Sequence, residues 1–155
     1  MRKTLIITTL MLASTVASAQ SLRTRYGTVA VNADKVLLVN GQIMQPQVTG
    51  NNELRIVHRY QLRTMDLVLI EDVGGTSCPS TYYVLQMDRA NSQVSHAFGT
   101  CATMGRVTQT ATGLTFEMIG YSPPNSSRSM QQAAMREQHR YSYANGRISD
   151  VTGQR

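Results

Sequence analysis

The sequence lacks tryptophan and is poor in aromatic, charged and cysteine residues. It has seven tyrosines, two phenylalanines and two cysteines, and 15% of its residues are charged. Two cysteines are too few for a four-thiolate zinc site. The only long apolar run lies at the N-terminus, so no later segment is long enough to cross a bilayer as a helix. With 41% hydrophobic residues, the 155-residue chain is too apolar to be disordered throughout and has the length of one domain.

The N-terminus has the layout of a secretory signal peptide. Arg2 and Lys3 precede an uncharged, largely apolar stretch at residues 5–16, and Ala17 and Ala19 form a small-x-small cleavage site. A membrane anchor is the alternative, but it needs about 20 apolar residues. We therefore expect a signal peptide at 1–19 and one β-rich domain at 20–155. The layout is typical of bacteria, which predicts a periplasmic or secreted protein after cleavage near Ala19.

The positive charge of the predicted mature chain comes almost entirely from arginine. Without Arg2 and Lys3, 13 basic and 9 acidic residues remain, a net charge of +4, and Lys35 is the single remaining lysine. Arginine binds carboxylates and phosphates in a bidentate manner that lysine does not match. This composition favours an acidic partner, whereas the charge is too small to indicate nucleic-acid binding.

The two cysteines, Cys78 and Cys101, predict a disulfide. An even cysteine count in an exported chain favours a disulfide. By closing the loop between the two cysteines, it would stabilise the folded protein by roughly 3 kcal/mol. A two-residue turn at Arg89-Ala90 would place the two cysteines opposite each other at the open end of a hairpin. A four-residue turn at 89–92 would offset them by two residues, which a bulge near Pro79 would correct. The alternative is a catalytic thiolate at Cys101 with His58 as its base, which requires an unpaired thiol.

Short β-type runs alternate with turn signals along the rest of the chain, the pattern of an all-β protein. Asn40-Gly41 and Asn145-Gly146 are strong hairpin signals, and the continuous apolar run 67–70 is typical of a central strand buried on both faces. The segments expected to form strands are 26–32, 36–39, 42–44, 54–62, 65–72, 80–88, 93–100, 105–110, 114–119, 141–144 and 147–151.

Residues 129–140 are the only helix candidate in the mature chain. Ser129 and Gln132 have the spacing of a capping box, and good helix formers follow. We therefore predict a mainly β (β+α) fold: an antiparallel meander or small sandwich with one C-terminal helix and one disulfide.

A cationic strip is predicted on the strand 54–62. Side chains alternate along a strand, so Arg55, Arg59 and Arg63 would share one face and bind an acidic partner. The alternative is an ordinary solvated face. The other face would place His58 among apolar residues, where a lone histidine is usually a neutral, hydrogen-bonded core residue.

Two further chemistries remain as alternatives. His58 with a nearby carboxylate, Asp66 or Glu71, would define an envelope hydrolase, although strand-end charges have the same pattern. Met135 and His139 are four residues apart on the predicted helix and would share a face, which suits a copper carrier. Methionine is also a general core filler.

The sequence around the cysteines resembles an uncharacterised family of small exported proteins of Gram-negative bacteria. The residues that carry the resemblance are 75–79 (GTSCP), Tyr82-Tyr83, 98–101 (FGTC), 34–38 (DKVLL) and Asn145-Gly146. The resemblance implies a disulfide-bonded β domain in the periplasm and assigns no catalytic residue.

These features favour a non-enzymatic periplasmic binding protein. Its partner would be a protein with an acidic surface, and the role of an inhibitor or immunity-type protein against an envelope-acting toxin is one form of this. A hydrolase or a small-ligand or metal carrier are the alternatives. We expect no cofactor, no bound metal and no nucleic-acid partner.

Overall fold

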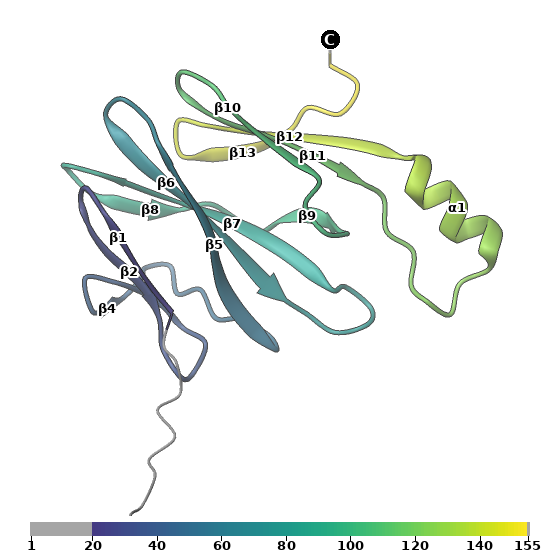
Figure 1. The fold of residues 1–155 in the computed structure, drawn as a ribbon, viewed down its shortest axis with the longest axis horizontal. Helices are drawn as coiled ribbons and strands as arrows, with labels where there is room; N and C mark the ends of the chain where they lie inside the picture. The colour runs from purple at the N-terminus through teal and green to yellow at the C-terminus, as the bar shows by residue number, and fades with distance from the viewer. Residues whose placement is uncertain (1–19, 155) are drawn as a thin grey trace, which may run out of the picture.

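The computed structural model describes residues 20–154, which form three antiparallel β-sheets and one helix (Figure 1). The predicted signal peptide, residues 1–19, lies outside the described residues. The first sheet, here called the N-terminal sheet, has its strands in chain order. Its strands are β1 (Ser21–Thr24), β2 (Gly27–Val31), β3 (Leu37–Val39) and β4 (Gln42–Ile43).

The central sheet contains the longest strands and also follows chain order, with one additional strand paired to β7. Its strands are β5 (Glu53–Gln61), β6 (Met65–Val73), β7 (Ser80–Asp88), β8 (Ser92–Val94) and β9 (Phe98–Cys101). The C-terminal sheet comprises β10 (Arg106–Gln109), β11 (Gly113–Ile119), β12 (Gln138–Ala144) and β13 (Arg147–Asp150). The helix α1 (Arg128–Arg136) connects β11 to β12.

The central sheet is the middle layer of three, and a hydrophobic core lies on each of its faces. Alternate residues of β6 point to opposite faces. The core shared with the N-terminal sheet contains Val29, Leu37, Val68, Ile70, Leu85 and Met87. The core shared with the C-terminal sheet contains Leu67, Leu69, Tyr82, Val84, Phe116 and Tyr143. The run 67–70 is therefore buried on both faces, as predicted, and the mainly β fold with one helix is confirmed.

Both predicted Asn-Gly hairpins are present. Asn40 and Gly41 have φ values of 53° and 80°, and Asn145 and Gly146 have φ values of 51° and 79°. A two-residue turn of this type needs positive φ at both central positions, which asparagine and glycine adopt most readily. These local signals set the registers of β3 with β4 and of β12 with β13.

A β-bulge in β5 reverses the alternation that the sequence implies. Ile56 is opposite Ile70, but His58 is opposite Leu69, so Val57 is an extra residue without a partner in β6. An inserted residue shifts every side chain beyond it to the other face of the sheet. The residues before and after Val57 therefore do not share the faces that simple alternation predicts.

The helix is shorter than predicted and begins earlier. Its N-cap is Ser127, whose hydroxyl accepts a hydrogen bond from the Met130 amide at 3.3 Å, and it ends at Arg136. The predicted span 129–140 was wrong because residues 138–144 form β12, which pairs with β11 at seven positions and buries Tyr143. This pairing outweighs the modest helix propensity of the segment. Strand β1 was not predicted either.

Candidate functional site

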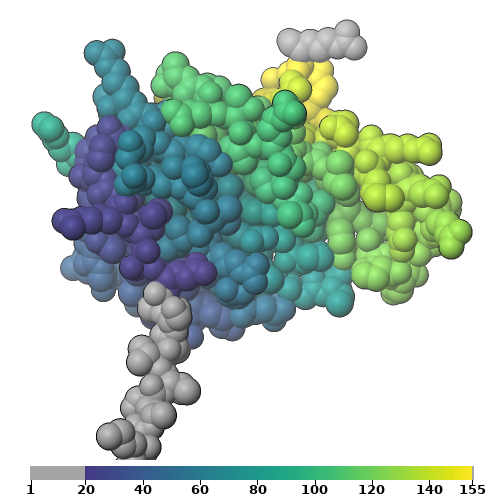
Figure 2. All heavy atoms as spheres, viewed as in Figure 1, coloured from purple at the N-terminus to yellow at the C-terminus, as the bar shows by residue number. Residues whose placement is uncertain are grey.

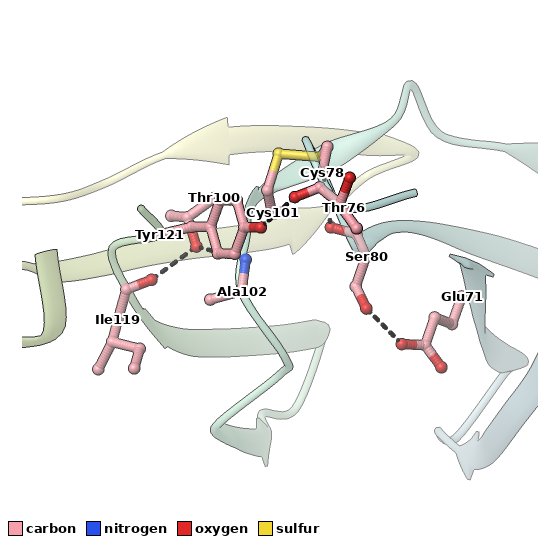
Figure 3. Close-up of a disulfide and its surroundings, with 9 residues drawn as sticks. All are labelled: Glu71, Thr76, Cys78, Ser80, Thr100, Cys101, Ala102, Ile119 and Tyr121. Carbon is pink, nitrogen blue, oxygen red and sulfur yellow. Dashed lines mark hydrogen bonds between the residues drawn. A yellow bond between two sulfur atoms is a disulfide. The ribbon is translucent and has the colours of Figure 1, made fainter. Parts of the chain in front are cut away.

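The predicted disulfide is present and joins the loop before β7 to the last residue of β9, at one end of the central sheet (Figure 3). The Cα atoms of Cys78 and Cys101 are 4.7 Å apart. Of the two turns that the sequence allows, the hairpin has the two-residue turn at Arg89-Ala90, because the Asp88 amide donates to the Asn91 carbonyl and Met87 is opposite Ser92. Register shifts further along place Cys101 opposite Ser80, so the bridge spans the end of the ladder diagonally.

A groove of about 530 Å³ lies beside this disulfide, between the sheets and α1; we call it the disulfide groove. In Figure 1 the helix stands at one end of the molecule, beyond the ends of β11 and β12, and the space-filling view shows it at the same end (Figure 2). Its walls come from Pro79, the segment 101–103, the segment 119–124 and α1. The main contributors are Cys101 and Ala102 at the end of β9, Ile119 and Tyr121 at the end of β11, and Ala134 and Met135 of α1.

Hydrogen bonds hold the segments that form the walls. The Thr100 hydroxyl donates to the Ile119 carbonyl at 2.6 Å, which ties β9 to β11, and the Tyr121 hydroxyl donates to the Thr76 carbonyl (Figure 3). Gly120 allows the close approach of α1, because a Cβ at this position would lie 2.7 Å from the Ala134 carbonyl oxygen. These contacts, together with the disulfide, indicate a preformed groove.

The lining of the disulfide groove is uncharged and presents apolar side chains to solvent. None of its twelve lining residues carries a formal charge. Met135 is 58% exposed and Ile119 is 39% exposed, so both side chains present apolar surface to solvent. Among residues 20–154, the Ser122 hydroxyl in this lining is the buried side-chain polar atom that lacks a hydrogen-bond partner. A preformed apolar concavity of this size is the usual form of a binding site.

The helix α1, which forms part of the groove, also carries positive charge. Arg128 and Arg136 are both exposed, and neither has a carboxylate within 4.0 Å in the described part of the chain. The first turn of the helix contains no acidic residue. The helix thus carries two arginines in addition to the residues with which it lines the groove.

The predicted cationic strip on β5 is not formed. Arg55 is opposite Glu71 and Arg59 is opposite Val68, so the bulge at Val57 places the two guanidinium groups on opposite faces of the central sheet. Arg55 binds Glu53 at 2.6 Å and lowers the pKa of that carboxyl. Arg59 donates to the Arg23 carbonyl at 2.6 Å, and Arg63 lies in the turn between β5 and β6.

The structure also separates His58 from the carboxylates proposed for a hydrolase. His58 is exposed and packs edge-on against Tyr60, so the expectation of a buried core histidine was wrong for the same reason, the bulge. Asp66 is fully buried and accepts hydrogen bonds from the Arg25 amide and Nε, both at 2.8 Å.

Glu71 is engaged elsewhere as well. It accepts hydrogen bonds from the Ser80 hydroxyl at 2.7 Å and from the Tyr82 hydroxyl at 3.3 Å. Between residues 20 and 154, His58 makes no hydrogen bond to Asp66 or Glu71. The arrangement required for the hydrolase alternative is not formed by these side chains.

The predicted Met135 and His139 pair does not share a helix face. Met135 lies in α1, whereas His139 lies in β12 and contacts Glu137 at 3.3 Å. In the part of the chain that the structure describes, no three His, Cys, Asp or Glu side chains are grouped as metal ligands would be. The copper alternative required a helix that continues to His139, but α1 ends at Arg136.

Comparison of the chain with protein-family models, curated proteins and solved structures found no match. Across residues 20–154, no helix has the length and apolar character that a membrane crossing requires. The interpretation of the site therefore depends on its own geometry.

Proposed function

We propose that this chain is a non-enzymatic binding protein of the bacterial periplasm, exported by the signal peptide at 1–19. Its partner is a protein with an acidic surface. A role as an inhibitor or immunity-type protein suits a small domain that a disulfide makes rigid. The observation that carries this proposal is the disulfide groove, an uncharged apolar concavity with Met135 and Ile119 exposed in it.

The composition of this surface supports a protein partner. Protein interfaces have an apolar centre in which methionine, tyrosine and arginine are enriched and lysine is depleted. The groove supplies Met135 and Tyr121, and α1 supplies Arg128 and Arg136. An apolar side chain of the partner would enter the groove, while its acidic side chains would contact the two arginines.

Affinity capture from periplasmic extract tests this function. The oxidised chain is immobilised beside a Met135→Glu variant, which places a negative charge in the groove, and an Ile43→Glu variant as the matched control. Ile43 is 49% exposed on β4, in the N-terminal sheet and outside the groove lining. We expect stoichiometric capture of one acidic protein, loss of capture with Met135→Glu only, and weaker capture as salt rises.

Capture that the Met135→Glu and Ile43→Glu variants reduce equally would contradict a role for the groove. Turnover of a cell-wall or lipid substrate by the purified chain would contradict the non-enzymatic function.

The size of the groove favours one further candidate, a small-ligand carrier. A volume of about 530 Å³ lies within the usual range of ligand pockets. An apolar fluorescent probe bound at one site per chain, and released by the Met135→Glu change, would support a carrier.

A further inference from the structure

The outer faces of the two flanking sheets differ sharply in chemistry. The strand registers of the N-terminal sheet align Ser21, Ala30, Leu38 and Ile43 in one row across its four strands. The corresponding row of the C-terminal sheet consists only of hydroxyl residues. Its members are Thr108 on β10, Thr115 on β11, Ser142 on β12 and Ser149 on β13.

This hydroxyl row faces away from the core. Val107, Phe116 and Tyr141, which precede or follow members of the row, pack into the core between the central and C-terminal sheets. Side chains alternate across a strand, so the hydroxyl residues point to the opposite face. Thr108 and Ser149 are exposed and the two central members are half-buried. None of the four hydroxyls forms a hydrogen bond with protein within residues 20–154, so their donors and acceptors are free.

Arginines flank the hydroxyl row on both sides. The neighbouring row consists of Arg106, Glu117 and Arg140, whose guanidinium groups lie 4.0 Å and 3.4 Å from the carboxylate between them. On the other side Arg147 is opposite Ala144. The strand positions of this face thus hold three arginines and one carboxylate. Each guanidinium has five N–H donors, so Glu117 leaves most of them unused.

Glu117 also lines two hollows of the surface. One hollow of about 430 Å³ is lined by Glu117, Gln138 and Arg140 together with the C-terminal segment 152–154. Another of about 390 Å³ is lined by Glu117 with Arg106 and Gln138. A ligand lying along the rows could therefore reach both arginines that contact Glu117.

We propose that the outer face of the C-terminal sheet binds an anionic polysaccharide that crosses the strands. Adjacent strands are about 4.8 Å apart, close to the length of one pyranose unit in a glycan chain, so each strand offers one hydroxyl per sugar. The Thr and Ser hydroxyls bind sugar hydroxyls, and the arginines bind the acidic groups of the polymer in a bidentate manner. The hydroxyl row and its arginines do not line the disulfide groove, although the hollow beside Arg106 shares Thr103 and Ile119 with it. The proposal does not depend on the function of the groove.

Binding to polygalacturonate, with neutral dextran as the control polymer, tests the proposal by isothermal titration calorimetry. The unaltered chain should bind polygalacturonate and not dextran. The double variant Thr115→Val, Ser142→Ala removes two hydroxyls with little change in shape or charge, and we expect it to weaken binding at least tenfold. Arg140→Ser should weaken binding by a similar factor.

Arg89→Ser is the matched control for charge, because Arg89 is an exposed arginine in the turn between β7 and β8, outside this face. Equal losses for Arg89→Ser and Arg140→Ser would show unspecific attraction of a basic protein and would overturn the proposal. Unchanged binding by the double variant would overturn it as well. Thermal melts of each variant confirm that the fold is retained, and retained binding by Met135→Glu separates this site from the groove.

Discussion

Removal of the disulfide should destabilise the protein by an amount that the loop length sets. The double variant Cys78→Ala, Cys101→Ala opens a loop whose ends are 23 residues apart in sequence. Without the crosslink the unfolded chain regains the entropy that loop closure had removed, which predicts a decrease in the free energy of unfolding of about 3.4 kcal/mol. For a chain of this length the melting temperature should fall by roughly 12 °C.

Alanine is the appropriate replacement at position 101. Cys101 has a φ of 71°, in the left-handed region that disfavours residues with a Cβ. Alanine retains the Cβ, so the backbone strain is the same in both proteins and cancels from the comparison. The measured difference then reports the crosslink and the loss of the sulfur atoms of two half-buried residues.

Urea denaturation measures the effect. The free energy of unfolding should fall as stated, and the slope m should rise because the uncrosslinked unfolded chain is more expanded. The unaltered protein in the presence of a thiol reductant should match the double variant. A loss below about 1 kcal/mol would refute the reasoning. It would show that pairing of β7 with β8 already restricts the loop in the unfolded ensemble.

Three other perturbations probe the layers of the fold. Asp66→Asn removes the charge of a fully buried carboxylate that pairs with the Arg25 guanidinium. Urea denaturation should show that the free energy of unfolding falls by about 2–4 kcal/mol. An unchanged free energy of unfolding would show that the pair is dispensable. Gly113→Ala should destabilise by more than 1 kcal/mol in the same assay, because the new Cβ would meet the Tyr143 carbonyl oxygen, whereas Gly75→Ala, with open space around it, is a control near zero. Burial raises the pKa of Tyr143 from its ordinary value of 10.0 to about 12. The protonated phenol therefore contributes stability that is complete below pH 10 and is lost as pH rises toward 12. Denaturation across this pH range should show a smaller alkaline loss for Tyr143→Phe; an identical loss would contradict the assignment.

Signals confined to short stretches of sequence predicted most of the fold. Asn40-Gly41 and Asn145-Gly146 favour their turns because of backbone sterics at two adjacent residues. The run 67–70 indicates a doubly buried strand because every residue in it is apolar. Cys78 and Cys101 predict a bridge from their number and the expected compartment. The turn and strand signals depend only on neighbouring residues, and two cysteines allow only one pairing. A single sequence was therefore sufficient to predict these features.

The residues proposed for function were harder to place. The cationic strip of Arg55, Arg59 and Arg63 depended on uninterrupted alternation, and one unpaired residue, Val57, reversed it. The bulge arises from the way β5 pairs with β6, and no residue type in the strand indicates its position. The pairing of Met135 with His139 depended on a helix that ends where β12 begins to pair with β11.

The sequence by itself determined that the chain forms β-strands at most of the observed positions, turns at its Asn-Gly pairs and can form one disulfide. Tertiary structure alone decided that three sheets stack in layers, that a groove opens beside Cys101, and that Thr108, Thr115, Ser142 and Ser149 align across four strands. The physical reason is range. Strand and turn preferences depend on neighbouring residues, whereas register and layering depend on contacts between segments far apart in the chain, which no local pattern encodes.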